Sequence, residues 1–295
     1  MNRYEKLMSR LRNGERIITD GATGTECERR GVPSIEHAWS GGGALSHPDI
    51  VRTIHEDYIR CGAEIVISNS FAATRHALRD AGLEQDFEAL NRRSVELVCE
   101  ARDKMRRPDV LVAGGVSYWS FTGNHPALDE LRSDVANQSA LMKDAGADLL
   151  MLEMMVDIDR MLVTIEAAQS SALPVWVGLT CEPDVNGTMC LRNGDTLVGA
   201  LSALSDTNVP LISIMHTEVK YIDTCLDVLE RHWDGLVGVY AHVGKFKDGQ
   251  WVFDFTISPH DYATHSARWL KQNVQIIGGC CGILPEHICA LESII

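Results

Sequence analysis

Short apolar runs alternate with longer amphipathic segments along most of the chain. Each run has four to six residues and is rich in Val, Ile and Leu, which is typical of strands buried on both faces of a parallel sheet. The eight predicted strands are Arg16–Thr19, Glu64–Ser68, Val110–Gly114, Asp148–Leu152, Val175–Thr180, Leu211–Met215, Leu236–Tyr240 and Val274–Ile277.

The segments between these runs repeat their apolar residues with helical spacing. The predicted helices are Asp49–Cys61, Phe87–Arg106, Asp129–Asp144, Asp157–Ser170, Asp195–Ser205, Glu218–Trp233, Pro259–Gln272 and Pro285–Ile294. Eight strand–helix units in strict alternation within 295 residues favour an α/β fold, a closed (β/α)8 TIM barrel. No Gly/Ser-rich or Pro-rich linker divides the chain, so we expect one domain over residues 1–295. Two long connections, Gly31–His47 and Gly115–Pro126, are expected to form lids and substrate walls.

Composition excludes several classes of partner. Acidic residues outnumber basic ones by 41 to 27, and no basic run resembles a nucleic-acid footprint. No apolar run approaches the ~20 residues of a membrane-spanning helix, and the N-terminus lacks the apolar core of a signal peptide. We therefore expect a cytoplasmic protein in a reducing compartment, and we leave its oligomeric state open. Of the nine cysteines, four that fall within predicted helices are expected to be core residues: Cys61, Cys99, Cys225 and Cys289.

The most informative segment is Gly278-Gly-Cys-Cys-Gly282, which directly follows the last predicted strand. Adjacent cysteines rarely bond to each other, because their Cα atoms are only ~3.8 Å apart, closer than a disulfide prefers. In a reducing compartment, two thiolates at a strand end favour one soft metal ion, most simply zinc. The alternative is a pair of small buried residues that pack a helix against a strand.

Polar residues stand at the carboxyl ends of most predicted strands, which is where the chemistry of such a barrel lies. They are Asp20, Asn69, Gly115, Glu153, Thr180, His216, Tyr240 with His242, and Cys280 with Cys281. We expect these groups to converge on one mouth of the barrel and to form a single site.

Two carboxylates among these residues suit an amino-acid ligand. Asp20, which is followed by Gly21, and Glu153 could together bind an ammonium group. The alternatives are a turn cap for Asp20 and a bridge to a nearby helix N-terminus for Glu153. Asn69 could donate to a substrate carboxylate or merely satisfy loop backbone.

Two histidines also stand at strand ends. His216 is a candidate third zinc ligand because two thiolates are expected nearby. His242 is either a competing ligand or a polar wall residue, and Tyr240 is predicted to contribute to substrate binding.

The chain contains three notable motifs, Asp20-Gly-Ala-Thr-Gly-Thr25, Ile67-Ser-Asn-Ser-Phe71 and Gly278-Gly-Cys-Cys-Gly-Ile-Leu-Pro-Glu-His-Ile288. They resemble the homocysteine S-methyltransferase family, which includes betaine–homocysteine methyltransferase and the homocysteine domain of methionine synthase. Ser258-Pro-His-Asp-Tyr262 also looks familial. The resemblance spans nearly the whole chain. It implies a (β/α)8 barrel that binds zinc through three cysteines and methylates the thiol of homocysteine.

Residue by residue, the resemblance implies that Cys280 and Cys281 bind zinc, and that Asp20, Gly21 and Glu153 hold the amino group of the amino acid.

The sequence departs from the family at two strand ends. Where the family has Gly-x-Asn-Cys with the third zinc cysteine, this chain has Ser213-Ile-Met-His216, and His242 replaces a family asparagine. A His/Cys/Cys site is chemically sound for zinc but carries one less negative charge. The metal should therefore be more electrophilic and a bound thiolate less nucleophilic.

The expected activity is zinc-dependent methyl transfer from an onium donor, with S-methylmethionine as the leading choice, to homocysteine, giving methionine for methionine biosynthesis. Trp39, Tyr118, Trp119 and Phe121 could cradle the donor cation or merely pack their loops. One alternative is a different onium donor with a different thiol or selenol acceptor. Another is a catalytically silent homologue that binds a metal or an amino acid.

Overall fold

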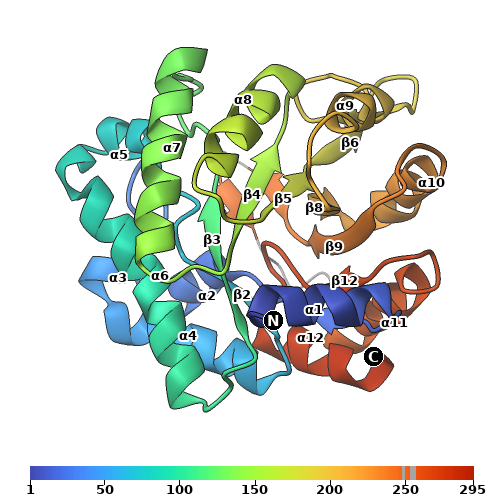
Figure 1. Ribbon diagram of the computed structural model, residues 1–295, viewed down its shortest axis with the longest axis horizontal. Coiled ribbons are helices and arrows are strands. Elements are labelled where there is room, and N and C mark those ends of the chain that lie inside the picture. Colours follow the sequence, from blue (N-terminus) through green and yellow to red (C-terminus); the bar gives the residue numbers. More distant parts are fainter. Residues whose placement is uncertain (248–249, 253–256) are drawn as a thin grey trace.

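The computed structural model describes residues 1–247, 250–252 and 257–295, and eight parallel strands stand at its centre (Figure 1). They are β1 (Ile17–Ile18), β2 (Ile65–Ile67), β3 (Leu111–Val116), β4 (Leu149–Met155), β5 (Val175–Leu179), β8 (Leu211–Glu218), β9 (Leu236–His242) and β12 (Ile276–Ile277). Their hydrogen-bonded order is β1-β12-β9-β8-β5-β4-β3-β2. Each coincides with one of the predicted strands.

The sheet closes on itself between its first and last strands. Thr19 and Ile65 form a parallel bridge, the Asp20 N–H donates to the Ile65 carbonyl at 3.0 Å, and the Glu64 N–H donates to the Ile18 carbonyl at 2.9 Å. Every residue of β2, β3 and β5 is buried, as strands covered by side chains inside and helices outside should be. The predicted TIM-type barrel is confirmed.

Helices cover the outside of the barrel at all eight predicted positions (Figure 1). They are α4 (Pro48–Arg60), α6 (Phe87–Lys104), α7 (Leu128–Asp144), α8 (Ile158–Gln169), α9 (Leu197–Leu204), α10 (Ile222–His232), α11 (Pro259–Trp269) and α12 (Pro285–Leu291). Local sequence sets several of the starts. Pro48, Pro259 and Pro285 occupy first helical turns, where no backbone donor is needed, and the Asp157 side chain accepts from the Arg160 N–H at the start of α8.

The described residues also form elements that the sequence pattern did not predict. They are the helices α1 (Arg3–Arg12), α2 (Thr23–Arg29), α3 (Gly43–Ser46) and α5 (Arg75–Asp80), the antiparallel hairpin of β6 (Cys181–Pro183) with β7 (Met189–Leu191), and that of β10 (Lys245–Lys247) with β11 (Gln250–Val252). The prediction of strict strand–helix alternation was therefore wrong. Most of these pieces are too short to give a clear periodic signal.

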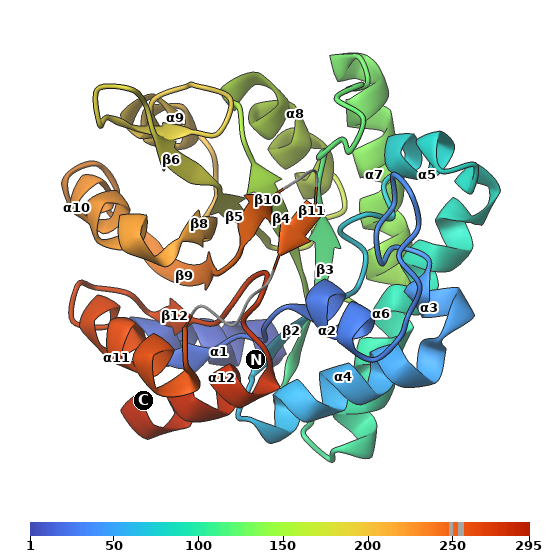
Figure 2. The same ribbon diagram turned by 180° about the vertical axis from the view of Figure 1, so that it is seen from behind.

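Helix α1 covers the amino-terminal end of the barrel, in front of the strands in Figure 1. Arg3 pairs with Asp148 at 2.8 Å, and Arg10 pairs with Glu64. Both acidic residues directly precede strands, β4 and β2 respectively. Figure 2, seen from behind, shows the β10–β11 hairpin in front of the strands instead. Helix α1 thus lies at the amino-terminal end of the barrel, and the hairpin that follows β9 lies at the carboxyl end.

Of two cysteines predicted to be core residues, Cys61 is buried in the core as expected, but it is bonded to the other, Cys289. Cys61, at the end of α4, forms a disulfide with Cys289 of α12, and Cys289 is exposed. Cys225 is buried as predicted, and Cys99 is half-buried. Disulfides persist mainly in oxidising environments, so this bond does not follow from the cytoplasmic expectation. Among the described residues, no helix is both long and apolar enough to cross a membrane.

Candidate metal centre

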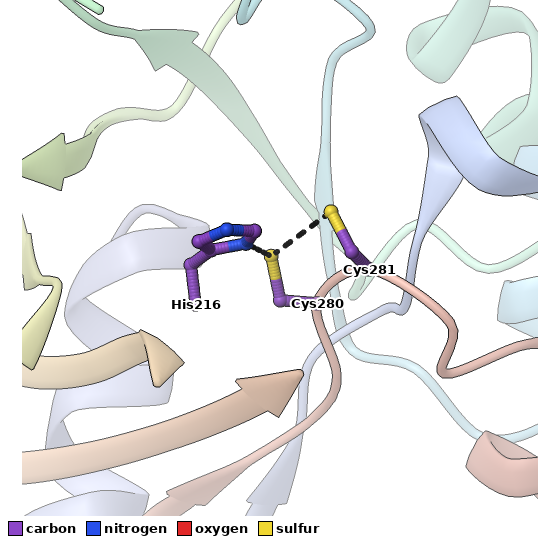
Figure 3. A group of neighbouring side chains, drawn as sticks. All are labelled: His216, Cys280 and Cys281. Atoms are coloured by element: carbon purple, nitrogen blue, oxygen red, sulfur yellow. Dashed lines mark hydrogen bonds between the residues drawn. The ribbon is translucent and has the colours of Figure 1, made fainter. Parts of the chain in front are cut away.

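Three side chains from distant parts of the sequence meet at the carboxyl end of the barrel (Figure 3). His216 comes from β8, and Cys280 and Cys281 come from the loop after β12. The Cys280 sulfur lies 3.5 Å from the His216 Nδ1 and 3.9 Å from the Cys281 sulfur, and the ligand atoms of all three residues lie within 4.8 Å of one another. The structure therefore brings together the three residues predicted to bind zinc.

A bulge in β8 sets the position of His216. The pairing of β8 with β9 shifts register between Met215 and Glu218, and His216 adopts a left-handed backbone with φ of +42°. A second bulge lies nearby in β4, where Met154 has φ of +54° and its N–H contacts the Met215 sulfur at 3.2 Å. Bulges redirect side chains, and left-handed non-glycine residues gather at functional sites. Both observations mark this end of the barrel as the site.

Backbone hydrogen bonds hold the loop that carries the two thiols. The Gly279 N–H donates to the Asp20 carbonyl at 3.0 Å, and the Cys280 N–H donates to the Ala241 carbonyl at 2.8 Å, so the loop is fixed to β1 and β9. A Cβ atom on Gly278 would lie only 2.2 Å from the Thr19 Cγ2, so only glycine fits there. The glycines before the cysteines thus allow the loop with the two thiols to approach the end of β1 closely.

The two contacts of the Cys280 sulfur have the spacing of a zinc site. In a tetrahedral site with ordinary zinc bond lengths, two sulfurs lie roughly 3.8 Å apart and a sulfur and a nitrogen roughly 3.6 Å apart. The Cys280–Cys281 and Cys280–His216 distances are 3.9 and 3.5 Å. The neighbouring Cys281 thiol, followed by burial, raises the pKa of Cys280 well above its ordinary value. A cation would therefore favour ionisation of this thiol pair.

The second histidine lies beside the first and outside the cluster. The rings of His242 and His216 have centroids 4.3 Å apart. Burial, followed by the charge of His216, lowers the pKa of His242 to about 3, so His242 stays neutral. Among the described residues, the group with metal-ligand spacing contains His216 and both cysteines but not His242.

A cavity of about 870 Å³ opens above the cluster. Residues of several strand ends and of the two long connections line it. Those predicted from the sequence are Gly21, Trp39, Asn69, Trp119, Phe121, Glu153, His216, Tyr240, Cys280 and Cys281. The expected convergence is therefore observed for six of the ten strand-end residues, whereas Asp20, Gly115, Thr180 and His242 do not line the cavity.

Glu153 supplies a carboxyl group to the wall of this cavity. Burial, followed by the charges of Cys280 and Asp20, raises its pKa well above the ordinary value. A Cβ atom on Gly115 would lie 2.8 Å from the Glu153 Oε2, so the glycine at the end of β3 leaves room for the carboxyl group. Such a group suits a positively charged ligand.

Tyr240 also lines this cavity and carries a buried hydroxyl group. The residue is 2% exposed, and its hydroxyl oxygen has no hydrogen-bond partner among the described residues. Burial, followed by the charge of Glu153, raises the pKa of Tyr240 well above its ordinary value, so the group stays a neutral donor. An unpaired buried hydroxyl is costly, and a ligand atom would satisfy it.

Asp20 and Asn69 are both tied to the protein. The Asp20 carboxyl accepts from the Ile67 N–H at 2.8 Å, and Asp20 does not line the cavity. It thereby braces the seam between β1 and β2. The Asn69 amide donates to the Ser40 carbonyl at 3.0 Å and accepts from the Ser40 hydroxyl at 3.2 Å, while still lining the cavity. Substrate binding by either residue stays a prediction.

The aromatic residues of the long connections divide into two groups. Trp39, Trp119 and Phe121 line the cavity, but Tyr118 is fully buried, and its hydroxyl accepts from the Val156 N–H at 2.7 Å. Tyr118 therefore supports the turn after β4. Phe71, which the sequence reasoning did not single out, also lines the cavity. Its place at the end of the Ile67–Phe71 motif was the available signal.

Arg192 is another lining residue that the sequence did not reveal. It follows the unpredicted hairpin of β6 and β7, so no strand end marked it. Its guanidinium carbon lies 5.2 Å from the centre of the Trp119 ring.

Comparisons with known proteins agree with this geometry. A sequence profile of the homocysteine S-methyltransferase family matches residues 17–295. The chain is 23% identical to homocysteine S-methyltransferase 2 of Arabidopsis thaliana, over 95% of this chain and 93% of that protein. It is 26% identical to selenocysteine Se-methyltransferase of Brassica oleracea var. italica, over 95% and 89% of the two chains.

Among solved structures, the metallated form of the homocysteine methyltransferase MmuM from Escherichia coli has the same fold. It superposes with a TM-score of 0.81 over 99% of both chains, at 23% sequence identity. The family profile covers nearly the whole sequence, including the loop with Cys280 and Cys281. The chain therefore belongs to the homocysteine S-methyltransferase family of enzymes.

Proposed function

We propose that this protein transfers a methyl group from an onium donor to the thiol of homocysteine, giving methionine. The observation that carries the proposal is the cluster of His216, Cys280 and Cys281 at the base of a cavity whose wall also holds Glu153. A set of soft and borderline ligands beside a carboxyl group suits a thiol that also carries an ammonium group.

Zinc fits the residues of the cluster. His216 would bind it through Nδ1, and Cys280 and Cys281 through their sulfurs, at the spacing described above. A zinc ion held there would keep the acceptor's sulfur as a thiolate at neutral pH, where a free thiol is mostly protonated. The fourth position of a tetrahedral site would remain for that sulfur.

The cavity wall orients the acceptor. Glu153 would bind its ammonium group, and the positive charge would draw the carboxyl group into its ionised form. The Tyr240 hydroxyl would donate to a polar atom of the ligand and so gain the partner it lacks. Asp20 and Gly21, which the family resemblance associates with the amino group, would support this end of the site from β1.

The reaction itself needs only alignment of two ligands. The acceptor's sulfur forms a bond to the methyl carbon while the bond from that carbon to the onium atom breaks. The electron pair stays on the donor, and the thiol proton is released to solvent. Aromatic rings favour an onium cation, and Trp39, Phe71 and Phe121 line the cavity. S-methylmethionine is the leading donor, and the methionine formed would serve methionine biosynthesis in the cytoplasm.

A second candidate keeps the site and changes the acceptor to a selenol. One similar protein is named a selenocysteine Se-methyltransferase. The His216 cluster also differs in charge from a site with three thiolates, which would alter the acceptor's reactivity. A catalytically silent protein that binds a metal or an amino acid is the remaining alternative.

One experiment separates these candidates. Freshly purified protein is analysed for zinc and then incubated with homocysteine or selenocysteine and each of several onium donors, and products are identified by mass. We expect one zinc per chain and methionine from homocysteine with S-methylmethionine. Zinc-loaded protein that methylates neither acceptor with any donor would instead support the silent homologue.

A further inference from the structure

Arg192 is held firmly at the edge of the cavity. Its N–H donates to the Thr180 carbonyl at 3.1 Å, and the N–H of the next residue, Asn193, donates to the Val156 carbonyl at 3.0 Å. These bonds fix the segment after the β6–β7 hairpin to the ends of β5 and β4. The backbone beneath this cation is therefore part of the barrel rim.

The side chain rests on a fixed aromatic platform. The Arg192 guanidinium carbon lies 5.2 Å from the centre of the Trp119 ring. The Trp119 N–H donates to the Ser117 hydroxyl at 3.1 Å, and its carbonyl lies 2.9 Å from the His76 Nε2. A guanidinium that stacks through its face keeps its in-plane N–H groups for other acceptors. The side chain is thus placed to bind a planar anion.

Carboxylates also line this cavity, among them Glu28, Glu36 and Glu153, but none of the described ones pairs with Arg192. Among the described residues, no carboxylate forms an ion pair with Arg192, although acidic residues outnumber basic ones by 41 to 27 in this chain. Most surface arginines here have partners; Arg160, for example, lies 3.6 Å from the Asp157 carboxylate. The half-buried cation on the cavity wall is an exception, and a ligand would supply the missing charge.

The same cation affects where an onium group can sit. Arg192 covers one face of Trp119, so that face is closed to a second cation, and like charges repel. Trp39, Phe71 and Phe121 lack such a neighbour among the described residues and are left for the onium group. A donor with an onium centre at one end and a carboxylate at the other matches this division.

We propose that Arg192 binds the carboxylate of a ligand in this cavity and thereby selects zwitterionic ligands over purely cationic ones. The inference rests on the proposed function for the identity of the ligands. The carboxylate belongs to the donor or to the acceptor, since both are amino acids in that function. Arg–carboxylate pairs are often bidentate, so the site should also distinguish arginine from lysine.

The test measures binding to the zinc-loaded protein by calorimetry, with no methyl transfer required. The donor pair is S-methylmethionine and 3-aminopropyl dimethylsulfonium, which lacks only the carboxylate. The acceptor pair is homocysteine and 3-aminopropanethiol, related in the same way. The proteins are the parent, Arg192→Met, Arg192→Lys and Lys220→Met. Lys220 is the matched control, because its charge also acts on His242, but it pairs with Glu218 at 2.7 Å and does not line the cavity.

We expect the parent to prefer the carboxylate member of at least one pair by roughly tenfold to a hundredfold, the value of a charge-assisted hydrogen bond. Arg192→Met should reduce that preference to near one, Arg192→Lys should keep part of it, and Lys220→Met should leave it unchanged. The pair that responds identifies whether the donor or the acceptor supplies the carboxylate.

The experiment distinguishes a merely structural role of Arg192 from failure of the proposed methyl transfer. If Arg192 only braces Trp119, Arg192→Met lowers the unfolding temperature while the carboxylate preference persists, which overturns the inference. Equal affinity of the parent for both members of each pair, or binding of neither, also overturns it. Absence of methyl transfer together with an Arg192-dependent preference would contradict the proposed function and leave this inference standing.

Discussion

The two ends of the barrel are built from the same strands but treat their polar groups in opposite ways. At the amino-terminal end, Asp148 and Glu64 are paired with arginines of α1. At the carboxyl end, the Tyr240 hydroxyl has no partner among the described residues. Burial raises the pKa of Glu153, and the neighbouring Cys281 thiol raises that of Cys280. Paired groups contribute to stability, whereas costly unpaired groups mark a site that ligands complete.

Strand bulges add to this difference. The bulges of β8 and β4 at the carboxyl end carry the left-handed residues His216 and Met154, whereas the left-handed residues near the amino-terminal end, Arg106, Ala172 and Asn273, lie in turns before strands. Such conformations cost free energy and persist only where the surrounding structure imposes them. The two ends thus differ in how far the protein itself satisfies their polar groups. Substitutions at the two ends should therefore have different consequences, from loss of function to small changes in stability.

The largest effect is expected when Cys280 or Cys281 is replaced. Cys280→Ala and Cys281→Ala should each lose zinc and reduce methyl transfer to background, because two remaining ligands hold the metal poorly. Zinc content by elemental analysis and product by mass check this. Cys99→Ala, at a half-buried cysteine of α6, is the control and should keep both. Full zinc content in both site variants would remove these cysteines from the metal centre.

Substitution of His216 tests the departure from the family. His216→Ala should release zinc to a chelator sooner than the parent, whereas His216→Cys should retain it through three thiolates and give a more electron-rich acceptor. The release rate in the presence of a colorimetric chelator measures this. His242→Ala is the control, since His242 lies outside the cluster. Release from His242→Ala that is faster than from His216→Ala would exchange the roles of the two histidines.

Glu153→Gln should raise the acceptor's KM roughly tenfold to a hundredfold while zinc content stays normal, because a charge-assisted hydrogen bond is lost. The pH dependence has a definite sign. The raised pKa of Glu153 leaves the carboxyl group neutral at lower pH, so the parent's acceptor affinity should increase as pH rises, and that of the variant should lose this increase. Affinity measured by calorimetry at several pH values checks both. Unchanged affinity in the variant would make Glu153 a structural residue.

Asp20 should give a smaller effect, on stability. Burial raises the pKa of Asp20 from 3.8 to about 8, so the folded protein keeps a proton that the unfolded chain releases between these values. Raising the pH through this window therefore favours unfolding, and the contribution is lost by about pH 8. Asp20→Asn still accepts from the Ile67 N–H but cannot ionise, so its free energy of unfolding in urea should vary less between pH 5 and pH 8. Equal pH dependence in both proteins would contradict the assignment.

The smallest effect is expected when an ion pair at the amino-terminal end of the barrel is removed. Arg3→Met removes a partly exposed ion pair with Asp148, and such pairs contribute about 0–1 kcal/mol. Urea unfolding should show a loss within that range, with zinc content and methyl transfer unchanged. A large loss of activity would show that the two ends are coupled more strongly than the comparison suggests.

Much of this architecture follows from the sequence because its signals are local. The buried apolar runs of β3, β4 and β5 alternate with long amphipathic helices, and that pattern predicts a parallel barrel. The glycines around Cys280 and Cys281 predict a tight loop at a strand end. Since strand ends of a barrel meet at one mouth, His216 and Glu153 could be assigned to the same site before their positions were known.

The tertiary structure decided what local patterns do not encode. The β6–β7 hairpin is too short for a periodic signal, so Arg192 was missed, and the Cys61–Cys289 disulfide joins residues 228 positions apart. Whether Asp20 faces a ligand or the seam with β2 depends on a hydrogen bond to a neighbouring strand. The sequence alone thus determined the fold and the residues available for chemistry. Their orientation and pairing depend on contacts between distant segments, which only the folded chain creates.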